Sequence, residues 1–334
     1  MIPCPPPEAK RRSRRIVALL ITVGALLLVF CVLSGPSGFG LPAIRTRTGY
    51  DILLLRLNRI ATGLIVGAAL SCAGVVFQAL LRNPLAEPYV LGVSSGAGLG
   101  AACAILIGFG SAFSLFLLPV TAFIGAILAL LIVLAVAGGT RASVYNLILS
   151  GVIVSAIASS ILMFLVTTAR SQEMHSVIWW MLGNLQPATY GQMVITAVVV
   201  VAGILTAWLI APQLDTLTLG REAAHHVGIR TARMTAVGLV LGSLLAAAAV
   251  SLAGLIGFVG LIVPHVMRSL LGPGHRRLIP ATAIAGGIFL AVCDAVARTV
   301  LAPRDIPVGV LTALCGGPFF LFILKWRGRR GWVE

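Results

Sequence analysis

Long runs of apolar residues, separated by short polar strips, dominate this chain. About 20 apolar residues are enough for an α-helix to cross the hydrocarbon core of a bilayer. On that basis the predicted fold class is all-α, a polytopic membrane bundle of about ten transmembrane helices. The helices are expected at 16–34, 60–81, 92–108, 115–137, 147–168, 193–211, 234–253, 256–271, 279–298 and 307–325. Glycines and Pro264 interrupt the eighth of these, so we expect a broken helix there.

The composition supports a membrane location. Of the 334 residues, 59% are hydrophobic and 10% are charged, whereas about a quarter of the residues in a soluble domain are charged. We therefore expect a single membrane domain over 16–326, with a basic tail at 1–15 and a short tail at 327–334. A cleaved signal peptide is the other interpretation of the basic start. The apolar run 16–34 is longer than a usual signal core and no A-x-A site follows it, so an uncleaved first span is favoured.

The charge pattern predicts how the chain is oriented. Lys and Arg number 24 against 9 acidic residues, a formal net charge of +15. Nucleic-acid binding would need basic residues clustered on a soluble face, but here they lie in strips between apolar runs, so no nucleic-acid partner is expected. Cytoplasmic loops carry an excess of Lys and Arg. Basic residues at 10–15 and 325–330 therefore predict that both ends are cytoplasmic, in a multi-pass protein of the cell membrane. The arginine-rich segment 45–59 falls on the outer side and departs from this rule.

A polar interruption at 212–233 predicts a short helix outside the bilayer. Thr218 is placed to cap its N-terminus, Glu222 falls in its first turns, and Gly228 follows as a C-terminal stop. Such a helix is either a contact surface for a partner or part of a solvated loop, and the spacing favours neither.

Several catalytic and energy-coupling motifs are missing from the sequence. It contains no G-x-x-x-x-G-K-[ST], H-E-x-x-H or G-x-S-x-G motif. The six cysteines form no C-x-x-C pair, so no metal site is expected. Asp294 is the acid expected within a span, and Arg298, four residues later, is its expected ion-pair partner. Three classes remain open from the residues: an ATP-driven permease, an ion-coupled secondary transporter and an intramembrane enzyme. For the first, a partner must supply the energy.

Four segments resemble the FecCD family, the permease subunits of ATP-binding-cassette (ABC) importers for iron-siderophores, haem and vitamin B12. The segment 55–101 carries the pattern Q-x-x-x-R-N-P-L-A-x-P-x-x-L-G, and 253–268 is similar to G-F-V-G-L-x-x-P-H-x-x-R. The stretch LTLGREAAHHVG at 217–228 looks like the family's coupling helix, and 294–324 resembles its closing motifs. The resemblance covers residues 16 to 326 in order.

The resemblance implies a particular assembly. A pair of permease subunits, identical or paralogous, would surround a central path, with ATPase subunits inside and a substrate-binding protein outside. The expected activity is ATP-driven uptake of a metal chelate by alternating access, most simply a ferric siderophore, with haem or cobalamin as alternatives. ATP and Mg²⁺ would bind the partner ATPase, so this chain itself would be neither an enzyme nor a cofactor protein. An ion-coupled secondary transporter is the alternative from another class.

The resemblance also implies roles for individual residues. Arg56, Arg59 and Arg298 would meet acidic residues of the binding protein, although pairing with headgroups or within the subunit is the alternative. The ATPase-coupling residues would be Leu219, Gly220, Glu222, Ala223, Ala224 and Gly228, within a coupling helix at about 216–228. Path, gate and signature residues would be Gln78, Arg82, Asn83, Pro84, Thr140, Ser143, Asn146, Gly257, Pro264, His265 and Arg268. For His265, a structural hydrogen bond to freed carbonyls is favoured over catalysis.

Three positions depart from the family pattern. Asn58 stands where a Pro is usual, and is expected to loosen the start of the second span. Arg221 replaces a common acid, and Asp305 replaces a Glu.

Overall fold

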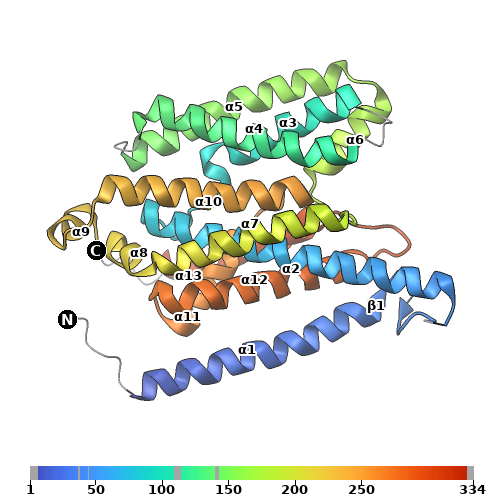
Figure 1. Ribbon diagram of the computed structural model, residues 1–334, viewed down its shortest axis with the longest axis horizontal. Coiled ribbons are helices and arrows are strands. Elements are labelled where there is room, and N and C mark those ends of the chain that lie inside the picture. Colours follow the sequence, from blue (N-terminus) through green and yellow to red (C-terminus); the bar gives the residue numbers. More distant parts are fainter. Residues whose placement is uncertain (1–6, 37, 44, 109–113, 140–142, 329–334) are drawn as a thin grey trace.

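The computed structural model describes residues 7–36, 38–43, 45–108, 114–139 and 143–328, which form a bundle of helices (Figure 1). The first half contains α1 (Pro7–Leu33), α2 (Arg47–Leu81), the short 3₁₀ helix η1 (Pro88–Leu91), α3 (Val93–Gly108), α4 (Ser114–Ala137), α5 (Val144–Thr168) and α6 (Ser171–Met181). The second half contains α7 (Tyr190–Leu209), α8 (Ala211–Thr218), α9 (Arg221–His226), α10 (Thr231–Ala253), α11 (Val259–Leu271), α12 (His275–Ala297) and α13 (Val308–Gly328). A small antiparallel hairpin of β1 (Ser34–Gly35) and β2 (Gly38–Phe39) pairs Ser34 with Phe39.

The predicted all-α membrane fold is confirmed. In the described part of the chain, seven helices are long and apolar enough to cross a membrane. Three shorter apolar helices, Val93–Ile107, Val259–Leu271 and Val308–Ile323, account for the remaining predicted spans. The start of α1 and the end of α13 lie at the same end of the bundle as α8 and α9 (Figure 1).

Two predicted helix starts differ most from the structure. Helix α2 begins at Arg47 rather than at 60, because Thr46 caps it by accepting a hydrogen bond from the Gly49 amide at 3.1 Å. Most of the arginine-rich segment 45–59 is therefore helical. Helix α1 begins at Pro7, so part of the expected basic tail is helical as well.

Helix α2 is the central element of the bundle. It packs against α7, α10, α11 and α12, and its sequence places small residues where other backbones come close. A Cβ at Gly67 would overlap the backbone of Gly286, and one at Gly74 would overlap the backbone of Gly260. The hydroxyl of Ser71 donates to the Thr282 carbonyl at 3.0 Å. Lipid gives helices no hydrophobic drive to associate, so this close approach is what holds them together.

A non-helical segment separates α10 from α11, as the glycines of the sequence predict. Its backbone groups are satisfied by side chains from the α2–α3 connection. The Glu87 carboxylate accepts from the amide of Phe258 at 2.6 Å, and the Tyr89 hydroxyl donates to the carbonyl of Ile256 at 3.0 Å. Backbone that is not helical at membrane depth must be satisfied in this way. The helix resumes at Val259 rather than at 256.

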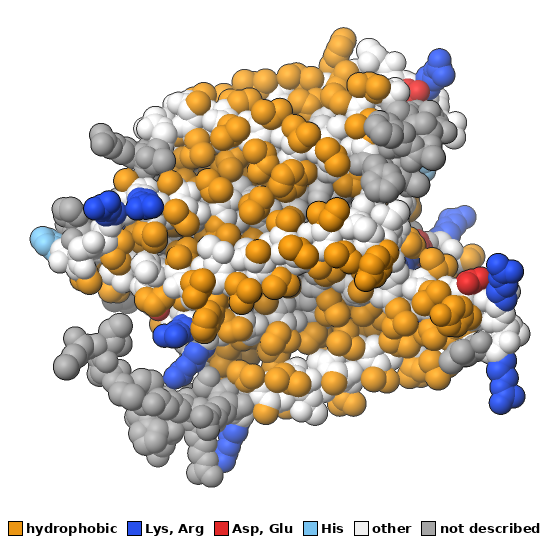
Figure 2. Space-filling model, in the orientation of Figure 1, with side chains coloured by type: hydrophobic (Ala, Val, Ile, Leu, Met, Phe, Trp, Pro, Cys, Tyr) orange, Lys and Arg blue, Asp and Glu red, His pale blue; other side chains and the backbone are white. Residues whose placement is uncertain are grey.

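The outer surface of the bundle is apolar between its two ends. Figure 2 shows hydrophobic side chains covering α4, α7 and α10, with the charged side chains gathered toward the two ends. Such a band is what a bilayer requires of a polytopic protein.

Candidate functional sites at the two ends of the bundle

Two arginines and two aspartates form an ion-pair network at the end of the bundle opposite α9. Arg59 donates through Nη2 to Oδ1 of Asp294 at 2.8 Å and through Nη1 to Oδ2 of Asp305 at 3.0 Å. Arg298 pairs with the same Asp294, from Nε to Oδ2 at 3.5 Å. The predicted Asp294–Arg298 pair is thus present, but the closer partner of Asp294 is Arg59. The network joins α2, α12 and the segment that precedes α13.

Backbone carbonyls hold the other guanidinium groups. Arg56 donates through Nη1 to the carbonyls of Val32 at 2.9 Å, Leu33 at 3.2 Å and Gly40 at 3.0 Å. Arg298 donates through Nη2 to the carbonyl of Cys31 at 2.9 Å. These bonds tie the end of α1 and the β1–β2 hairpin to the arginine cluster.

Two of these arginines are almost fully buried, and the docking role that the resemblance implies for the three stays a prediction. Arg56 is 4% exposed, Arg298 is 2% exposed and Asp294 is fully buried. The sequence could not show this, because the carbonyl acceptors of Arg56 lie in a different element. Pairing within the subunit, the alternative to contact with a partner protein, is what the structure contains.

The three arginines nevertheless share one cavity, which we call the arginine pocket. Its volume is about 310 Å³, and it is lined by Pro36, Ile52, Leu55, Arg56, Arg59, Pro187 and Arg298. Among the described charged side chains here, the guanidinium groups of Arg56, Arg59 and Arg298 outnumber the carboxylates of Asp294 and Asp305. The pocket therefore carries excess positive charge in a partly dry setting, where a further carboxylate would be attracted. The lining residues Leu55 and Pro36 were not anticipated from the sequence.

Asn58 has a structural role that its sequence position did not predict. It lies well inside α2 rather than at its start, so the expected loosening is not observed. Its side-chain amide donates to the carbonyl of Ala188 at 2.9 Å and its side-chain oxygen accepts from the amide of Ala188 at 3.1 Å. This pair fixes the segment 184–189 over the arginine pocket.

At the other end of the bundle, the polar segment contains two helices instead of one. Thr218 does not cap the second helix: it is the last residue of α8, and its hydroxyl donates to the carbonyl of Asp215 at 2.6 Å. Gly220, with a φ of +122°, makes the turn into α9. Its carbonyl accepts from the amide of Ala224 at 3.0 Å. Where a single helix was expected at about 216–228, the structure has the end of α8, a turn and α9.

The predicted stop at Gly228 is confirmed. Gly228 has a φ of +84°, a conformation that favours glycine, and the amide of Ile229 donates back to the carbonyl of Ala224 at 3.0 Å. Ala224 is fully buried and Ala223 is half-buried. Glu222 belongs to α9, but its side chain lies outside what the structure describes.

Two large apolar side chains project from this segment. Leu219 is 77% exposed and Val227 is 72% exposed. Leu219 was a sequence candidate, whereas Val227 was not. Both side chains are available to a partner.

Helix α12 connects the two ends. At its start, Asp215 of α8 accepts from the backbone amide of His275 at 2.9 Å and lies 2.6 Å from Nδ1 of the same residue. Trp208 of α7 donates to the carbonyl of Arg276 at 3.1 Å, and the Arg276 guanidinium lies 5.2 Å from the Trp208 ring. At its other end α12 carries Asp294 and Arg298. The arginine pocket and the α8–α9 segment are thus attached to the same rigid element.

Comparisons with known proteins identify the family. The model of the FecCD transport family matches residues 45–326, which is most of the chain. The protein belongs to the FecCD transport family. It is 33% identical to the hemin transport system permease protein HmuU of Yersinia pestis, over 93% of this chain and 97% of that one. It is 40% identical to the cobalamin import system permease protein BtuC of Halobacterium salinarum, over 88% of this chain and 78% of that one.

A solved structure supports the same assignment. The inward-facing conformation of a metal-chelate type ABC transporter matches with a TM-score of 0.85 and 29% identity, covering 93% of this chain and 99% of that one. As a FecCD member, the chain is an ABC importer permease.

The FecCD signature residues near α2 and α11 hold these helices together. Arg268 donates through Nη1 to Oε1 of Gln78 at 2.9 Å, and Gln78 donates through Nε2 to the carbonyl of Gly260 at 3.2 Å. Arg82 ends α2 with a φ of +48°, and the side chain of Asn83 accepts from the amide of Leu85 at 2.9 Å. Their part in a path or gate stays a prediction.

The remaining signature residues lie in or beside α11. Pro84 is exposed in the connection after α2, and Gly257 lies in the segment before α11. Pro264 and His265 lie within α11, where the His265 ring centroid is 6.3 Å from each of the Phe319 and Phe320 rings. This places His265 at the contact between α11 and α13. The hydrogen bond expected of it stays a prediction.

The structure describes two of the three gate candidates, Ser143 and Asn146. Ser143 caps α5 by accepting from the Asn146 amide at 3.1 Å, and both residues are exposed. Thr140 lies outside the described residues. A gate role for the start of α5 stays a prediction.

Proposed function

We propose that this permease takes up a metal chelate, most simply a ferric siderophore, by alternating access driven by partner ATPase subunits. The observation that carries this proposal is that α12 links an arginine pocket at one end to the α8–α9 segment at the other, where Leu219 and Val227 are exposed. The names of the relatives support the substrate class, since they include hemin, cobalamin and Fe(3+)-citrate systems. Haem and cobalamin are the alternative cargoes.

The assembly we propose follows the charge pattern and the family. A second permease subunit completes the central path in the cell membrane. The end that carries α8 and α9 faces the cytoplasm, where the ATPase binds ATP and Mg²⁺, and the arginine pocket faces outward. An ion-coupled transporter is disfavoured because the buried acid Asp294 is held between Arg59 and Arg298 and offers no free carboxylate.

At the outer end, the arginine pocket is proposed to receive a carboxylate of the substrate-binding protein. The guanidinium groups are fixed beforehand by carbonyls and aspartates, so docking need not order them. Opposite charges of this kind steer the encounter and fix the orientation of the partner.

Leu55→Glu should block this docking without removing any buried guanidinium. Leu55 lines the pocket and is 50% exposed, so a glutamate there can fold while its carboxylate occupies the pocket. We expect capture of the loaded binding protein to weaken by at least about tenfold, because like charges then face each other. The measurement is surface-immobilised binding at two salt concentrations. Leu55→Gln, which is similar in size but uncharged, is the control and should bind nearly normally; equal binding by both variants would contradict the docking role.

At the inner end, Leu219 and Val227 are proposed to insert into the ATPase. The test is reconstitution of the permease with its ATPase and binding protein in vesicles that report accumulation of a ferric siderophore, haem or cobalamin. We expect accumulation to require ATP. We also expect Leu219→Glu to reduce substrate-stimulated ATP hydrolysis by at least about 30-fold, because the loss of one strong contact costs about 2 kcal/mol. Leu219→Met is the matched control. Accumulation without any ATPase would overturn the proposed function, and normal stimulation in Leu219→Glu would remove the coupling role alone.

A further inference from the structure

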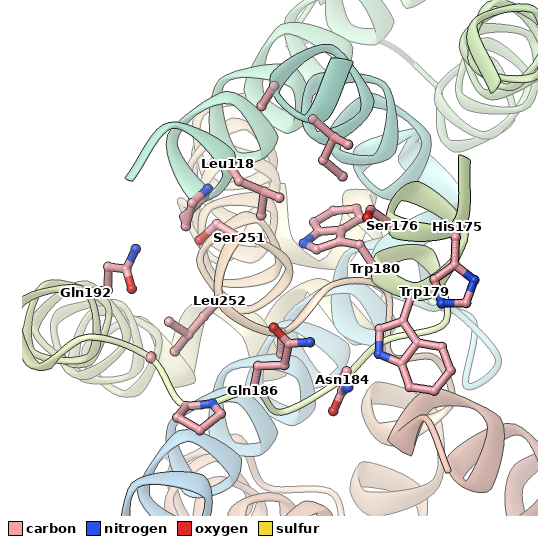
Figure 3. A pocket seen from close by; sticks show the side chains of 16 residues that line it. Leu118, His175, Ser176, Trp179, Trp180, Asn184, Gln186, Gln192, Ser251 and Leu252 are labelled. Carbon is pink, nitrogen blue, oxygen red and sulfur yellow. The ribbon is translucent and has the colours of Figure 1, made fainter. Parts of the chain in front are cut away.

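A second and larger cavity lies at the same end of the bundle as the arginine pocket. Its volume is about 450 Å³, within the range of small-molecule sites. Figure 3 shows Leu118 of α4, Trp180 of α6, Gln192 of α7 and Ser251 and Leu252 of α10 around it. We call it the α4–α7 cavity. Pro187, in the 184–189 segment, lines both this cavity and the arginine pocket.

Backbone contacts join the walls of this cavity. The backbone N–H of Asn184 donates to the backbone carbonyl of Ala253 at 2.9 Å. A Cβ at Gly254 would overlap the carbonyl of Trp180, so α6 packs directly on the end of α10. The cavity is therefore formed before anything enters it.

The cavity lies at the depth where helices end. Helix α6 ends at Met181, α7 begins at Tyr190 and α10 ends at Ala253, and neighbours of all three line the cavity. In a bilayer this level is the boundary between headgroups and acyl chains, where tryptophan side chains concentrate. Trp179 and Trp180 both line the cavity, and Trp180 points from α6 toward Ser251 (Figure 3).

The surface beside the cavity is continuous with the lipid-facing surface. Helices α4 and α7 both pack on α10 and contribute opposite walls. Next to those walls, Val120 of α4 is 53% exposed and Ile195 of α7 is 68% exposed. The same face is covered by hydrophobic side chains in Figure 2. An acyl chain can therefore lie against protein and bilayer at once.

The lining chemistry is neutral. Among the described residues that line the cavity there is no Lys, Arg, Asp or Glu; the polar groups are amides, hydroxyls, indoles and one imidazole. Gln186 and Asn184 supply amide donors and acceptors beside apolar walls. This contrasts with the arginine pocket, which attracts anions. A neutral lining suits a headgroup with no net charge and does not favour an anionic one.

We propose that the α4–α7 cavity binds one zwitterionic phospholipid, with an acyl chain against Leu118 and Leu252 and the headgroup near Asn184 and Gln186. The lipid occupies the space between α4 and α7 over the end of α10.

The test uses phosphatidylcholine brominated on its acyl chain, because bromine quenches indole fluorescence on contact. Purified permease in detergent is titrated with this lipid. We expect quenching that saturates near one lipid per chain, with the saturable part lost in the double variant Trp179→Phe, Trp180→Phe, because both indoles line the cavity. Ser251→Leu, which fills the cavity, should weaken the saturable binding by at least about tenfold. Ser176→Leu, from the α6 wall, is a second filling variant, and Val198→Leu on the exposed face of α7 is the matched control.

Each alternative outcome overturns the proposal. Quenching that rises without saturation, or that is unchanged in both filling variants, means annular lipid only. Stronger saturable quenching by brominated phosphatidylglycerol means that an anionic lipid occupies the site. Displacement of the brominated lipid by a soluble ferric siderophore or haem means that the cavity takes cargo.

Discussion

Asp294→Asn should destabilise the folded protein by about 3–5 kcal/mol, the range observed when one partner of a buried ion pair is removed. Asp294 is fully buried and is the shared partner of Arg59 and Arg298. Asparagine keeps the size and some hydrogen bonds, but it leaves two buried guanidinium groups facing each other without the carboxylate. The measurement is the free energy of unfolding in mixed micelles, followed by labelling of the buried thiols of Cys31, Cys72 and Cys293.

Asp305→Asn is the matched control for this prediction. Asp305 also pairs with Arg59, but its side chain is 35% exposed, so water can replace much of what the substitution removes. We expect a loss of about 1 kcal/mol or less, as for other solvent-exposed pairs. Equal losses from the two variants would show that burial of Asp294 does not determine the strength of the network.

The sequence predicted the spans well because a membrane span can be recognised from a continuous run of apolar residues alone. A run of about 20 apolar residues rarely forms any other structure, and the glycines at 254–260 marked the break between α10 and α11. The start of α2 was missed for a related reason. Arg56 and Arg59 interrupt the apolar run, and only the folded chain brings the carbonyls of Val32 and Gly40 to Arg56.

The candidate sites were predicted in part. The identities of Arg56, Arg59 and Arg298 came from family resemblance, and the structure brings all three to one cavity. Their burial depends on Asp294 and Asp305, which are distant in sequence from Arg59, so no local pattern could show it. At the other end, Thr218 looked like a cap because it precedes a turn, but Gly220 is the residue whose backbone makes that turn.

The central position of α2 was the least predictable feature. All the spans are apolar, so hydrophobicity does not say which helix is surrounded by the others. The signal that could have shown it is the density of small residues in 63–74, read together with Gly260 and Gly286. Small residues at helix contacts replace the hydrophobic pattern that orders helices in water.

Gly74→Ala should therefore be among the most damaging of small substitutions, while Gly191→Ala should be harmless. A Cβ at Gly74 would overlap the carbonyl oxygen of Gly260, which is backbone and cannot rotate away, whereas a Cβ at Gly191 would meet nothing within 4 Å. Both glycines lie within helices. We expect Gly74→Ala to cost about 3 kcal/mol as α2 and α11 are pushed apart, and Gly191→Ala to be neutral or to stabilise by up to about 1 kcal/mol.

The same unfolding assay measures both variants, and Cys72 of α2, whose thiol contacts the carbonyl of Ile279 in α12 at 3.7 Å, reports opening of the bundle around α2. Its thiol is buried in the folded protein, so we expect Gly74→Ala to speed its labelling under native conditions while Gly191→Ala leaves the rate unchanged. Equal stability of the two variants would mean that contact between α2 and α11 is not what holds the centre of the bundle together. In that case, the Gln78–Arg268 and Gln78–Gly260 hydrogen bonds, which join the same two helices, would be what holds α2 and α11 together.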